Sequence, residues 1–396
     1  MKKLGLLPRI ILAIGLGIII GLISPEWLIK ILATFNGLFG NFLGFAIPLI
    51  IIGFIAPGIG TMGRGAGKLL GVTTGLAYGS TIIAGLIAFF AANTLYPTIL
   101  RNQSLTSFEN PEEALLSGYF QVDMPPIMGV MTALLLAFTL GLGMAALKNN
   151  ALLHVMNDFR SIVEKLIEKV IIPLLPIHIF GIFSNMTYGG QVGDIMSVFA
   201  KVFVMIIALH VLYLVLQYFV AGSVSKRNPF RLLKEMAPAY FTALGTQSSA
   251  STIPVTLIHT KKLGARTKTA DFSVPLLATI HLSGSTITLV SCAIAVLMLQ
   301  GQEITFTGIL PFIFMLGVTM IAAPGVPGGA VMAALGLLET MLGFDSTMLS
   351  LMIALYLAQD SFGTACNVTG DGALTVIADK ISGQDDPSEQ NAEIAS

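Results

Sequence analysis

The chain has 396 residues, of which 55% are hydrophobic and only 11% are charged, and its formal net charge is zero. This composition, with 41 glycines and several long apolar runs, is typical of a helical protein that crosses a lipid bilayer many times. A balanced charge argues against nucleic acid as a partner. Both cysteines, Cys292 and Cys366, lie in apolar segments, which predicts packed thiols rather than a disulfide.

The first half of the chain predicts four membrane-spanning helices. Lys2, Lys3 and Arg9 flank the first apolar run, so the positive-inside rule places the N-terminus in the cytoplasm. We interpret this run as a span rather than a cleaved signal. The polar segment 97–126 is expected to be an external loop. The further spans of this half are predicted at about 28–59, 69–96 and 126–147.

Some polar side chains in these runs allow two interpretations. The hydroxyls of Tyr78, Ser80 and Thr81 in the third span are expected to bond to their own helix, and the alternative is an ion site. An amphipathic stretch at 155–170 leads into an apolar segment that its prolines should break. His178 in that segment is expected to be a core histidine with satisfied ring nitrogens rather than a ligand.

The second half shows a different pattern. Full spans are predicted at about 195–221 and 272–299, but two other apolar segments are interrupted. GTQSSASTIP interrupts the segment 236–258, and AAPGVPGGA interrupts the segment 306–337. Short apolar arms that meet at a Ser-, Gly- or Pro-rich tip indicate re-entrant hairpins, with kinked helices as the alternative. Paired interruptions of this kind indicate the binding site of a transporter.

A polar stripe marks the last apolar segment, LAQDSFGTACNVTGDGALTVI at 357–377. In a helix, Asp360, Thr364, Asn367 and Asp371 would share an arc of roughly 60°, with the two carboxylates about 16 Å apart along the axis. In a soluble protein such a stripe would face water. In a membrane it should face a cavity or the bundle interior, which indicates ligand or ion handling.

Four motifs of the second half resemble those of the glutamate transporter family, the sodium:dicarboxylate symporters, which also contains neutral amino-acid transporters. SSASTIPVT at 248–256 resembles the first hairpin tip, and PGVPGGA at 324–330 resembles the second. ATIHLSGS at 278–285 is similar to the family's ATINMDGT-type helix break. DSFGTACNVTGD at 360–371 is similar to the last-helix signature D-x-x-R-T-x-x-N-x-x-G-D, with the arginine missing.

The resemblance implies an all-α polytopic membrane protein with about eight transmembrane helices and two re-entrant hairpins. It also implies a homotrimer in which a transport domain slides like an elevator along a scaffold. We expect the inner membrane of a prokaryote, with both termini cytoplasmic, and a lipid bilayer and an amino acid as partners. The expected segments are scaffold at 1–67 and 97–190, transport domain at 68–96 and 191–383, hairpins at about 228–262 and 304–340, and a disordered tail at 384–396.

The resemblance also implies the site residues. Asp360 would hold the substrate ammonium, and Asn367 with the first tip would hold its α-carboxylate. No cofactor other than coupling ions is expected. The substrate-binding residues carried over are Gln247, Ser248, Ser249, Ser285, Val326, Gly328, Gly329, Asp360, Gly363, Thr364 and Asn367. The sodium ligands carried over are His281, Asn367 and Asp371. Thr279 and the carbonyls around Ala322 and Ala323 would fall at a second sodium site beneath the second hairpin.

Departures from the family pattern favour a neutral substrate. Gly363 replaces the arginine of acidic-substrate members, Gln247 stands where some members have another arginine, and no Lys or Arg occurs between Asp271 and Asp379. A second substrate carboxylate would then be buried without a cationic partner, which costs several kcal/mol. A small neutral amino acid such as serine, threonine or alanine fits better, and an acidic substrate is the alternative.

A further departure concerns the coupling ion. Where the family has N-M-D, this chain has His281, Leu282 and Ser283, so one sodium site loses its carboxylate. Asp371 remains, which favours at least one sodium ion. Histidine titrates near neutral pH, so His281 is also a candidate proton site.

Two other function classes fit the sequence less well. An aspartyl enzyme would need two carboxylates close enough to share a proton, and the predicted separation of Asp360 and Asp371 excludes that pair. A passive channel would need neither a buried partner for an ammonium group nor gating hairpins. We therefore expect a transporter and no enzyme.

Overall fold

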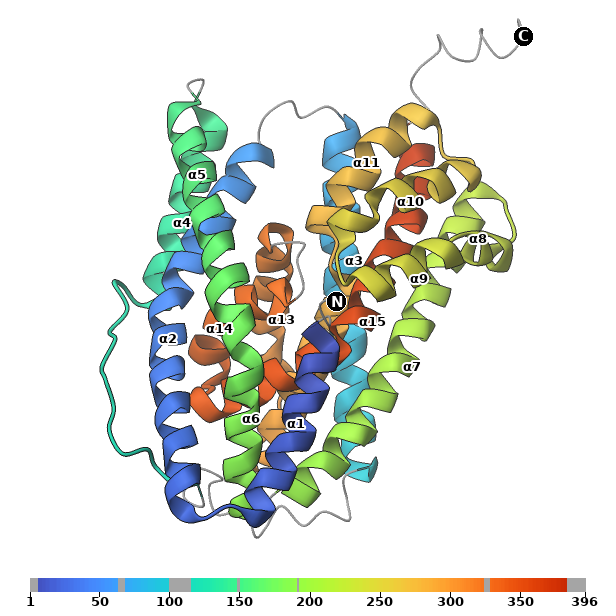
Figure 1. Ribbon diagram of the computed structural model, residues 1–396. Coiled ribbons are helices and arrows are strands. Elements are labelled where there is room, and N and C mark those ends of the chain that lie inside the picture. The colour runs from blue at the N-terminus through green and yellow to red at the C-terminus, as the bar shows by residue number, and fades with distance from the viewer. Residues whose placement is uncertain are drawn as a thin grey trace, which may run out of the picture.

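The computed structural model describes residues 6–62, 68–99, 115–147, 150–190, 192–323 and 328–382. Within these ranges the secondary structure is helical, which confirms the predicted all-α class (Figure 1). The helices are α1 (Leu6–Ile23), α2 (Glu26–Met62), α3 (Lys68–Ile99), α4 (Val130–Ala146), α5 (Ala151–Leu166), a π-helical turn (Ile167–Ile171), α6 (Ile172–Tyr188), α7 (Val192–Ser225), α8 (Pro229–Glu235), α9 (Ala237–Thr246), α10 (Ser249–Lys262), α11 (Thr267–Ile280), α12 (Ser283–Leu299), α13 (Phe306–Ala322), α14 (Gly329–Leu342) and α15 (Ser346–Ser382).

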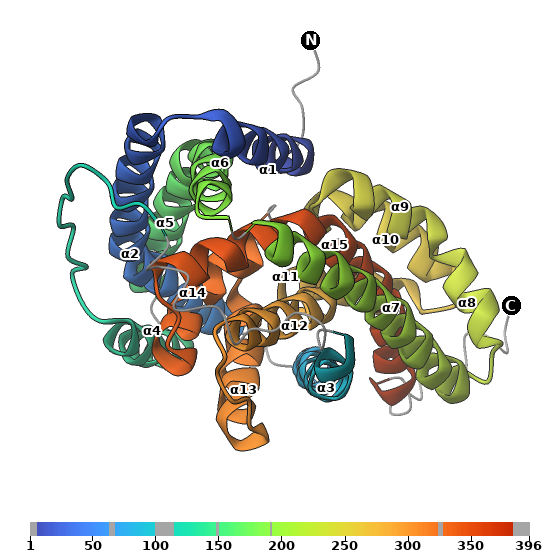
Figure 2. The same ribbon diagram turned by 90° about the horizontal axis from the view of Figure 1, so that it is seen from below.

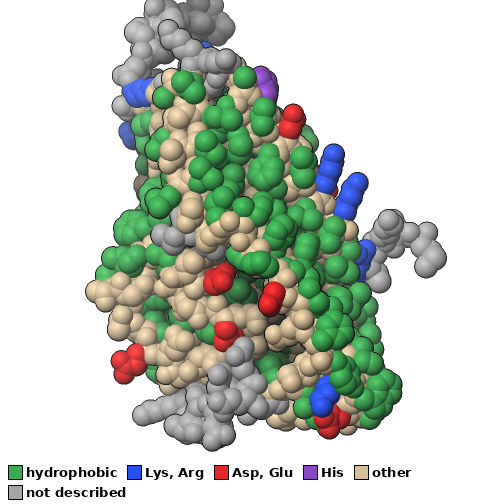
Figure 3. Space-filling model, turned by 90° about the vertical axis from the view of Figure 1, so that its left-hand side faces the viewer, with side chains coloured by type: hydrophobic (Ala, Val, Ile, Leu, Met, Phe, Trp, Pro, Cys, Tyr) green, Lys and Arg blue, Asp and Glu red, His purple; other side chains and the backbone are tan. Residues whose placement is uncertain are grey.

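Several of these helices are long and apolar enough to cross a bilayer. Five such segments occur among the described residues, at 26–60, 68–99, 151–188, 196–225 and 267–299. Shorter apolar helices lie at 8–23, 135–146, 306–322 and 329–342. Hydrophobic side chains cover much of the face shown in Figure 3. Among the described residues, large hydrophobic side chains such as those of Leu22 and Leu135 are well exposed. A surface of this kind is suited to lipid rather than to water.

α1, α2, α4, α5 and α6 pack mainly against one another, on one side of the molecule in Figures 1 and 2. Glycines let α1 approach α6 closely: a Cβ added at Gly17 would lie 2.8 Å from the carbonyl oxygen of Phe180. A Cβ at Gly21 would collide with the carbonyl oxygen of Ser184. Small residues at such a crossing are a common means of helix packing in membranes.

The proline-rich segment 172–188 is less interrupted than its sequence predicts. A π-helical turn joins α5 to α6, so the chain continues as one rod through Pro173 and Pro176. Pro173 lies at the start of α6, directly after the π-helical turn, where the regular ladder of backbone hydrogen bonds is already interrupted. The prediction that the prolines break this segment was therefore wrong.

His178 is a core histidine, as predicted. Its Nδ1 lies 3.1 Å from the Asn36 side chain of α2, and its Nε2 lies 3.0 Å from Ser350 Oγ of α15. The side chain is 2% exposed. Both ring nitrogens are therefore satisfied inside the bundle, and the residue links α6 to two other helices.

The chain before α4 is extended, although the sequence predicts helix from residue 126. Side chains of the flanking helices hold this segment: Asn185 exchanges two hydrogen bonds with the backbone of Leu116. Asn41 Nδ2 of α2 donates to the carbonyl of Val122. The consecutive prolines 125 and 126 lack backbone N–H groups and disfavour helix at this point, so α4 begins only at Val130.

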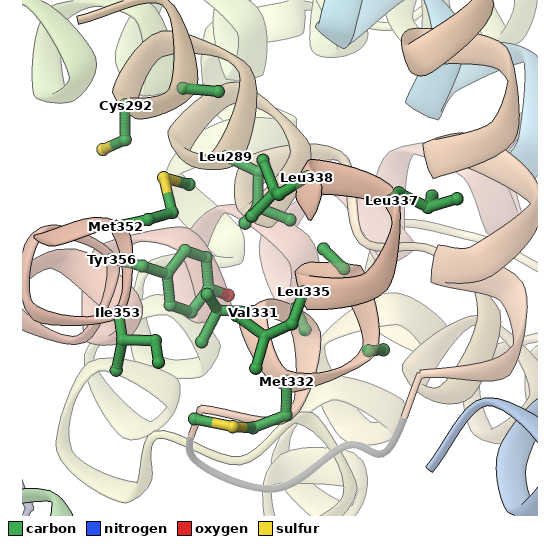
Figure 4. Packing of buried hydrophobic residues seen from close by; sticks show 14 of the residues in the cluster. Leu289, Cys292, Val331, Met332, Leu335, Leu337, Leu338, Met352, Ile353 and Tyr356 are labelled. Carbon is green, nitrogen blue, oxygen red and sulfur yellow. The ribbon is translucent and has the colours of Figure 1, made fainter. Parts of the chain in front are cut away.

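α15 lies at the centre of the second packing group and is buried over most of its length. α3, α7, α9, α10, α11 and α12 pack around it. Figure 4 shows the contact with the second interrupted segment, where Val331 and Leu335 of α14 meet Leu289 of α12 and Tyr356 of α15. Cys292 and Cys366 are buried free thiols, which confirms the predicted absence of a disulfide between them.

The two interrupted segments each form a pair of packed helices. α9 packs against α10 and α13 against α14. Between α9 and α10 the chain turns at Gln247, which adopts a left-handed backbone conformation with φ 54°, and Ser248 caps α10 through a bond from the N–H of Ser251. Whether the pairs are re-entrant stays a prediction. Residues 324–327 of the second tip, most of the loop at 97–126 and the tail after 382 lie outside the described residues.

Ion pairs join the ends of α8, α10, α11 and α15. Lys261 lies 2.6 Å from Asp271, and Arg266 lies 2.8 Å from Asp379, the penultimate charged residue of α15. His259 Nδ1 lies 3.0 Å from Glu235. These contacts link α10 to α8 and α11, and they link the start of α11 to the end of α15.

Candidate substrate and cation site

The polar stripe predicted on the last helix faces the protein interior. Asp360, Asn367 and Asp371 of α15 are 6%, 1% and 0% exposed, respectively. Burying two carboxylates inside an apolar bundle is costly unless hydrogen bonds and cations compensate them. The partners of each side chain therefore define what the site can bind.

Asp360 contacts the second interrupted segment. Its Oδ2 accepts a 2.7 Å hydrogen bond from the backbone N–H of Gly328, the residue that precedes α14. Gly328 has φ +74°, a conformation that glycine adopts without strain. A Cβ at Gly328 would lie 2.9 Å from Leu357, so the turn also sits directly on α15. The structure thus brings together Asp360 and Gly328, two of the predicted substrate-binding residues.

Asn367 lies at the predicted helix break. α11 ends at Ile280 and α12 begins at Ser283, so the first N–H groups of α12 have no partner within their own helix. Asn367 Oδ1 accepts from the N–H of Gly284 at 2.7 Å and from the N–H of Ser285 at 3.3 Å. Its Nδ2 donates to Ser285 Oγ at 3.0 Å. An amide from α15 therefore caps α12, and predicted residues Asn367 and Ser285 lie in contact.

Asp371 pairs with the histidine of the break. Its Oδ1 lies 2.8 Å from Nδ1 of His281, and both side chains are almost completely buried. The opposite ring nitrogen, Nε2, lies 2.9 Å from Ser80 Oγ of α3. Thr81 bonds back to its own helix, but Ser80 reaches into this group. Thr81 therefore follows the first predicted interpretation, and Ser80 lies beside the candidate ion site. Tyr78 follows neither, because its hydroxyl donates to the Phe314 carbonyl of α13.

Two side chains of α7 complete this group, and neither was predicted from the sequence. Tyr213 donates to the carbonyl of Ser80 at 2.6 Å, and Gln217 Nε2 donates to Ser80 Oγ at 3.0 Å. A signal was present: the polar residues at positions 210, 213 and 217 recur every three to four residues within an apolar span, which places them on one helix face.

Glycine is required beside this group. A Cβ at Gly370 would lie 2.6 Å from Gln217 Oε1 and 2.9 Å from Cε1 of His281. α15 can therefore lie against α7 and the helix break only because Gly370 has no side chain. Gly370 of the last-helix motif is therefore explained by helix packing, whereas the carboxylates of the motif are explained by ligand chemistry.

Some oxygen atoms in this region have no hydrogen-bond donor in the described part of the chain. Asp371 Oδ2 and Gln217 Oε1 are both buried and unpartnered, and so are the hydroxyls of Ser283 and Thr369. Carboxylate, amide and hydroxyl oxygens are ligands that suit a hard cation. The buried, unpartnered Asp371 Oδ2 is therefore a candidate sodium ligand.

Other predicted residues are placed less directly. The Thr279 hydroxyl is exposed and donates to the Leu276 carbonyl of its own helix, and its assignment to the second sodium site stays a prediction. Ser248 and Ser249 are buried at the start of α10. Val326 lies outside the described residues. Gly329 begins α14, Thr364 and Gly363 are buried on α15, and Ala322 and Ala323 are buried at the end of α13.

Two open cavities of the described residues lie elsewhere. One of about 700 Å³ lies between α2, α14, the start of α15 and the extended segment before α4. Another, of about 370 Å³, is lined by polar side chains that include His178 and Asn185. Neither is lined by Asp360, Asn367 or Asp371, so the polar face of α15 is enclosed in this conformation.

Comparison with known proteins agrees with this geometry. The model of the sodium:dicarboxylate symporter family matches residues 6–381. The chain belongs to this family. The match includes the helix break, both interrupted segments and the polar face of α15.

Curated relatives in this family are transporters. The serine/threonine transporter SstT of Acinetobacter baumannii strain AYE is 26% identical over 403 aligned residues, which cover 96% of this chain and 97% of the relative. Proteins of the same name from strains AB307-0294 and AB0057 match to the same extent. The family and the relatives indicate a multi-pass membrane transporter rather than an enzyme, as predicted from the sequence.

Proposed function

We propose that this protein is a secondary active transporter that carries a small neutral amino acid, such as serine, threonine or alanine, together with sodium. The observation that carries the proposal is the pair of buried carboxylates on one face of α15. The described hydrogen bonds of Asp360 and Asp371 come from a backbone N–H and an imidazole, with no lysine or arginine among the donors. With a neutral imidazole at His281, each buried anion requires a cation from outside the protein.

The substrate ammonium is the proposed cation for Asp360. A carboxylate that accepts from one N–H retains acceptor capacity for a charged amine. Asn367 Nδ2 and the start of α12 supply donors nearby for the α-carboxylate. No lysine or arginine follows Asp271 until Lys380, so a dicarboxylate would bring a charge that the site does not balance. The names of the curated relatives are consistent with a hydroxylated neutral substrate.

Sodium is the proposed cation for Asp371. Its unpartnered Oδ2 supports a site for a hard cation, and the buried, unpartnered Gln217 Oε1 is a further candidate ligand. Because both carboxylates lie on one rigid helix, binding of the amino acid would be linked to binding of sodium. The helices around α15 pack mainly with one another, as do α2, α4, α5 and α6, and this division supports the sliding of a transport domain. A homotrimer in the inner membrane completes the proposal by family resemblance.

Ligand-induced thermal stabilisation of the purified protein tests the proposal. A ligand that binds only the folded state raises the melting temperature by mass action. We expect serine, threonine or alanine to raise it in the presence of sodium and to do so weakly when choline replaces sodium. Stabilisation by aspartate or glutamate would contradict the proposed substrate class. Sodium-independent stabilisation that changes with pH would contradict sodium coupling and favour the proton alternative.

A transport assay separates the proposal from a passive channel. In proteoliposomes we expect saturable serine uptake that an inward sodium gradient drives above equilibrium. Uptake that rises linearly with serine concentration and never exceeds equilibrium would indicate a channel instead.

Asp371→Asn should weaken sodium binding while keeping the bundle intact. The amide keeps the volume and an acceptor for His281 but removes the negative charge that we assign to the ion. We expect the sodium concentration for half-maximal stabilisation by serine to rise at least about tenfold, because a charged ligand contributes on the order of 1.5 kcal/mol or more. Asp379→Asn is a matched control, since Asp379 is a buried carboxylate of the same helix that pairs with Arg266. An unchanged sodium dependence in Asp371→Asn would contradict the assignment.

A further inference from the structure

His210 of α7 is a buried histidine that none of the predicted roles includes. It is 2% exposed, and its Nε2 donates to the carbonyl oxygen of Gly284 at 2.9 Å. The Thr288 hydroxyl lies 3.2 Å from the same ring nitrogen. Because the partner is a carbonyl, the proton of a neutral ring lies on Nε2. The other ring nitrogen, Nδ1, is buried and has no hydrogen-bond partner in the described residues.

Satisfying the Gly284 carbonyl does not explain this histidine. A carbonyl in the first turn of an α-helix already accepts from the peptide N–H four residues later. The Gly284 carbonyl also accepts from the Thr288 hydroxyl at 3.2 Å. A third donor on one carbonyl, at the expense of an unpartnered ring nitrogen in an apolar interior, is a net cost to folding. The hydrogen bond from His210 is therefore better explained by the Asn367 amide, which the neighbouring backbone N–H groups of α12 bind.

Gly284 connects His210 to the proposed substrate site. The carbonyl of Gly284 accepts from His210 of α7, and the N–H of Gly284 donates to Asn367 Oδ1 at 2.7 Å. Gly284 also fits against α15 with no space for a side chain, since its Cβ would lie 2.5 Å from the Gly363 carbonyl oxygen. The start of α12 is therefore fixed from two sides, by His210 on α7 and by Asn367 on α15.

The break in the chain makes this fixing necessary. His281 and Leu282 separate α11 from α12, and Leu282, at the N-cap position, makes no side-chain capping bond. The first turn of a helix with no cap of its own frays. His210 holds the carbonyl of the Gly284–Ser285 peptide, and the N–H of the same peptide donates to Asn367 Oδ1 at 3.3 Å. Without His210, this peptide would be held from the Asn367 side alone.

We propose that His210 is a positioning residue for substrate recognition. By holding the carbonyl of the Gly284–Ser285 peptide, it keeps the N–H of that peptide directed at Asn367 Oδ1, so that Nδ2 of the Asn367 amide is presented to the substrate α-carboxylate. The proposal rests on the proposed function, because it assigns the Asn367 amide to an amino-acid carboxylate.

Three substitutions of His210 separate positioning from packing. His210→Gln places an amide Nε2 within reach of the Gly284 carbonyl, His210→Asn is too short to reach it, and His210→Leu has no donor. We expect the dissociation constant for serine, measured by calorimetry in saturating sodium, to rise about tenfold in the Asn and Leu variants, the effect of one lost hydrogen bond. The Gln variant should remain within about threefold of the unsubstituted protein. In proteoliposomes the same variants should raise KM more than they lower the maximal rate.

His178 provides the matched control. It is an equally buried histidine with a hydrogen bond on each ring nitrogen, but its partners are Asn36 and Ser350 rather than the helix break. His178→Gln and His178→Leu should lower the melting temperature and leave the dissociation constant for serine unchanged.

The outcomes distinguish the two proposals. Serine affinity that is unchanged in His210→Asn and His210→Leu, or that falls equally in His210→Gln, would overturn the positioning role while leaving the proposed function intact. If no amino acid of the panel stabilises the unsubstituted protein, the proposed function fails, and the role of His210 is overturned with it. If His210→Leu does not fold, the serine affinities of the Gln and Asn variants still support or overturn the positioning role.

Discussion

Asp360→Asn is expected to abolish serine binding while leaving the protein folded. The amide has nearly the same volume and can still accept from the N–H of Gly328, so α14 keeps its contact with α15. The substrate ammonium, however, would lose the negative charge that we propose as its partner. Leaving a buried charge without its partner costs about 3–5 kcal/mol, which corresponds to a loss of affinity of roughly a hundred- to several thousandfold. Calorimetric titration with serine in saturating sodium measures the effect.

The control for this prediction is again Asp379→Asn. Asp379 is 4% exposed on the same helix, but it pairs with Arg266 at the far end. This variant should lose stability and keep its serine affinity. Serine binding by Asp360→Asn within tenfold of the unsubstituted protein would show that the ammonium lies elsewhere.

Gly284→Ala is expected to disrupt both the fold and the site. Its added methyl carbon would lie 2.5 Å from the carbonyl oxygen of Gly363 and 2.6 Å from Cβ of Cys366. One of these atoms is backbone and the other is attached directly to it, so neither can move without separating α12 from α15. Overpacking of this kind costs about 1–3 kcal/mol or more. We expect a lower melting temperature and no stabilisation by serine, because the N–H that holds Asn367 moves as well.

Gly75→Ala on α3 is the control for this substitution. It makes the same chemical change within a helix, but its Cβ would meet nothing within 4 Å. Alanine favours helix over glycine by up to about 1 kcal/mol, so this variant should melt no lower than the unsubstituted protein. A Gly284→Ala protein as stable as Gly75→Ala would mean that α12 and α15 are not in close contact.

Local sequence patterns predicted the helices and the polar face of α15 because both depend on residues close together in the chain. The period of Asp360, Asn367 and Asp371 placed them on one face, and the structure shows that face buried. The break at His281 and Leu282 was identified from the family motif and is confirmed.

Partners contributed by distant helices could not be predicted in this way. That Asn367 caps α12, or that Ser80 and Gln217 surround His281, depends on how α3, α7, α12 and α15 pack. The pattern of a single sequence does not allow a prediction of which polar helix faces pack against one another. The π-turn before α6 was missed for a different reason, because its register change follows from packing on both sides of Pro173 rather than from a local motif.

Gly284 of α12 and Gly363 of α15 lie at the same helix contact but differ in the space available for a side chain. This difference bears on how substrate selectivity can evolve. A Cβ at Gly284 has no space, whereas a Cβ at Gly363 would meet its nearest atoms at 3.4–3.5 Å, which is ordinary van der Waals contact. Gly363 can therefore be replaced by alanine without forcing the two helices apart. It is the position where acidic-substrate members of the family carry an arginine. Descendants of such a protein could acquire a new substrate class through Gly363 while Gly284 stays fixed.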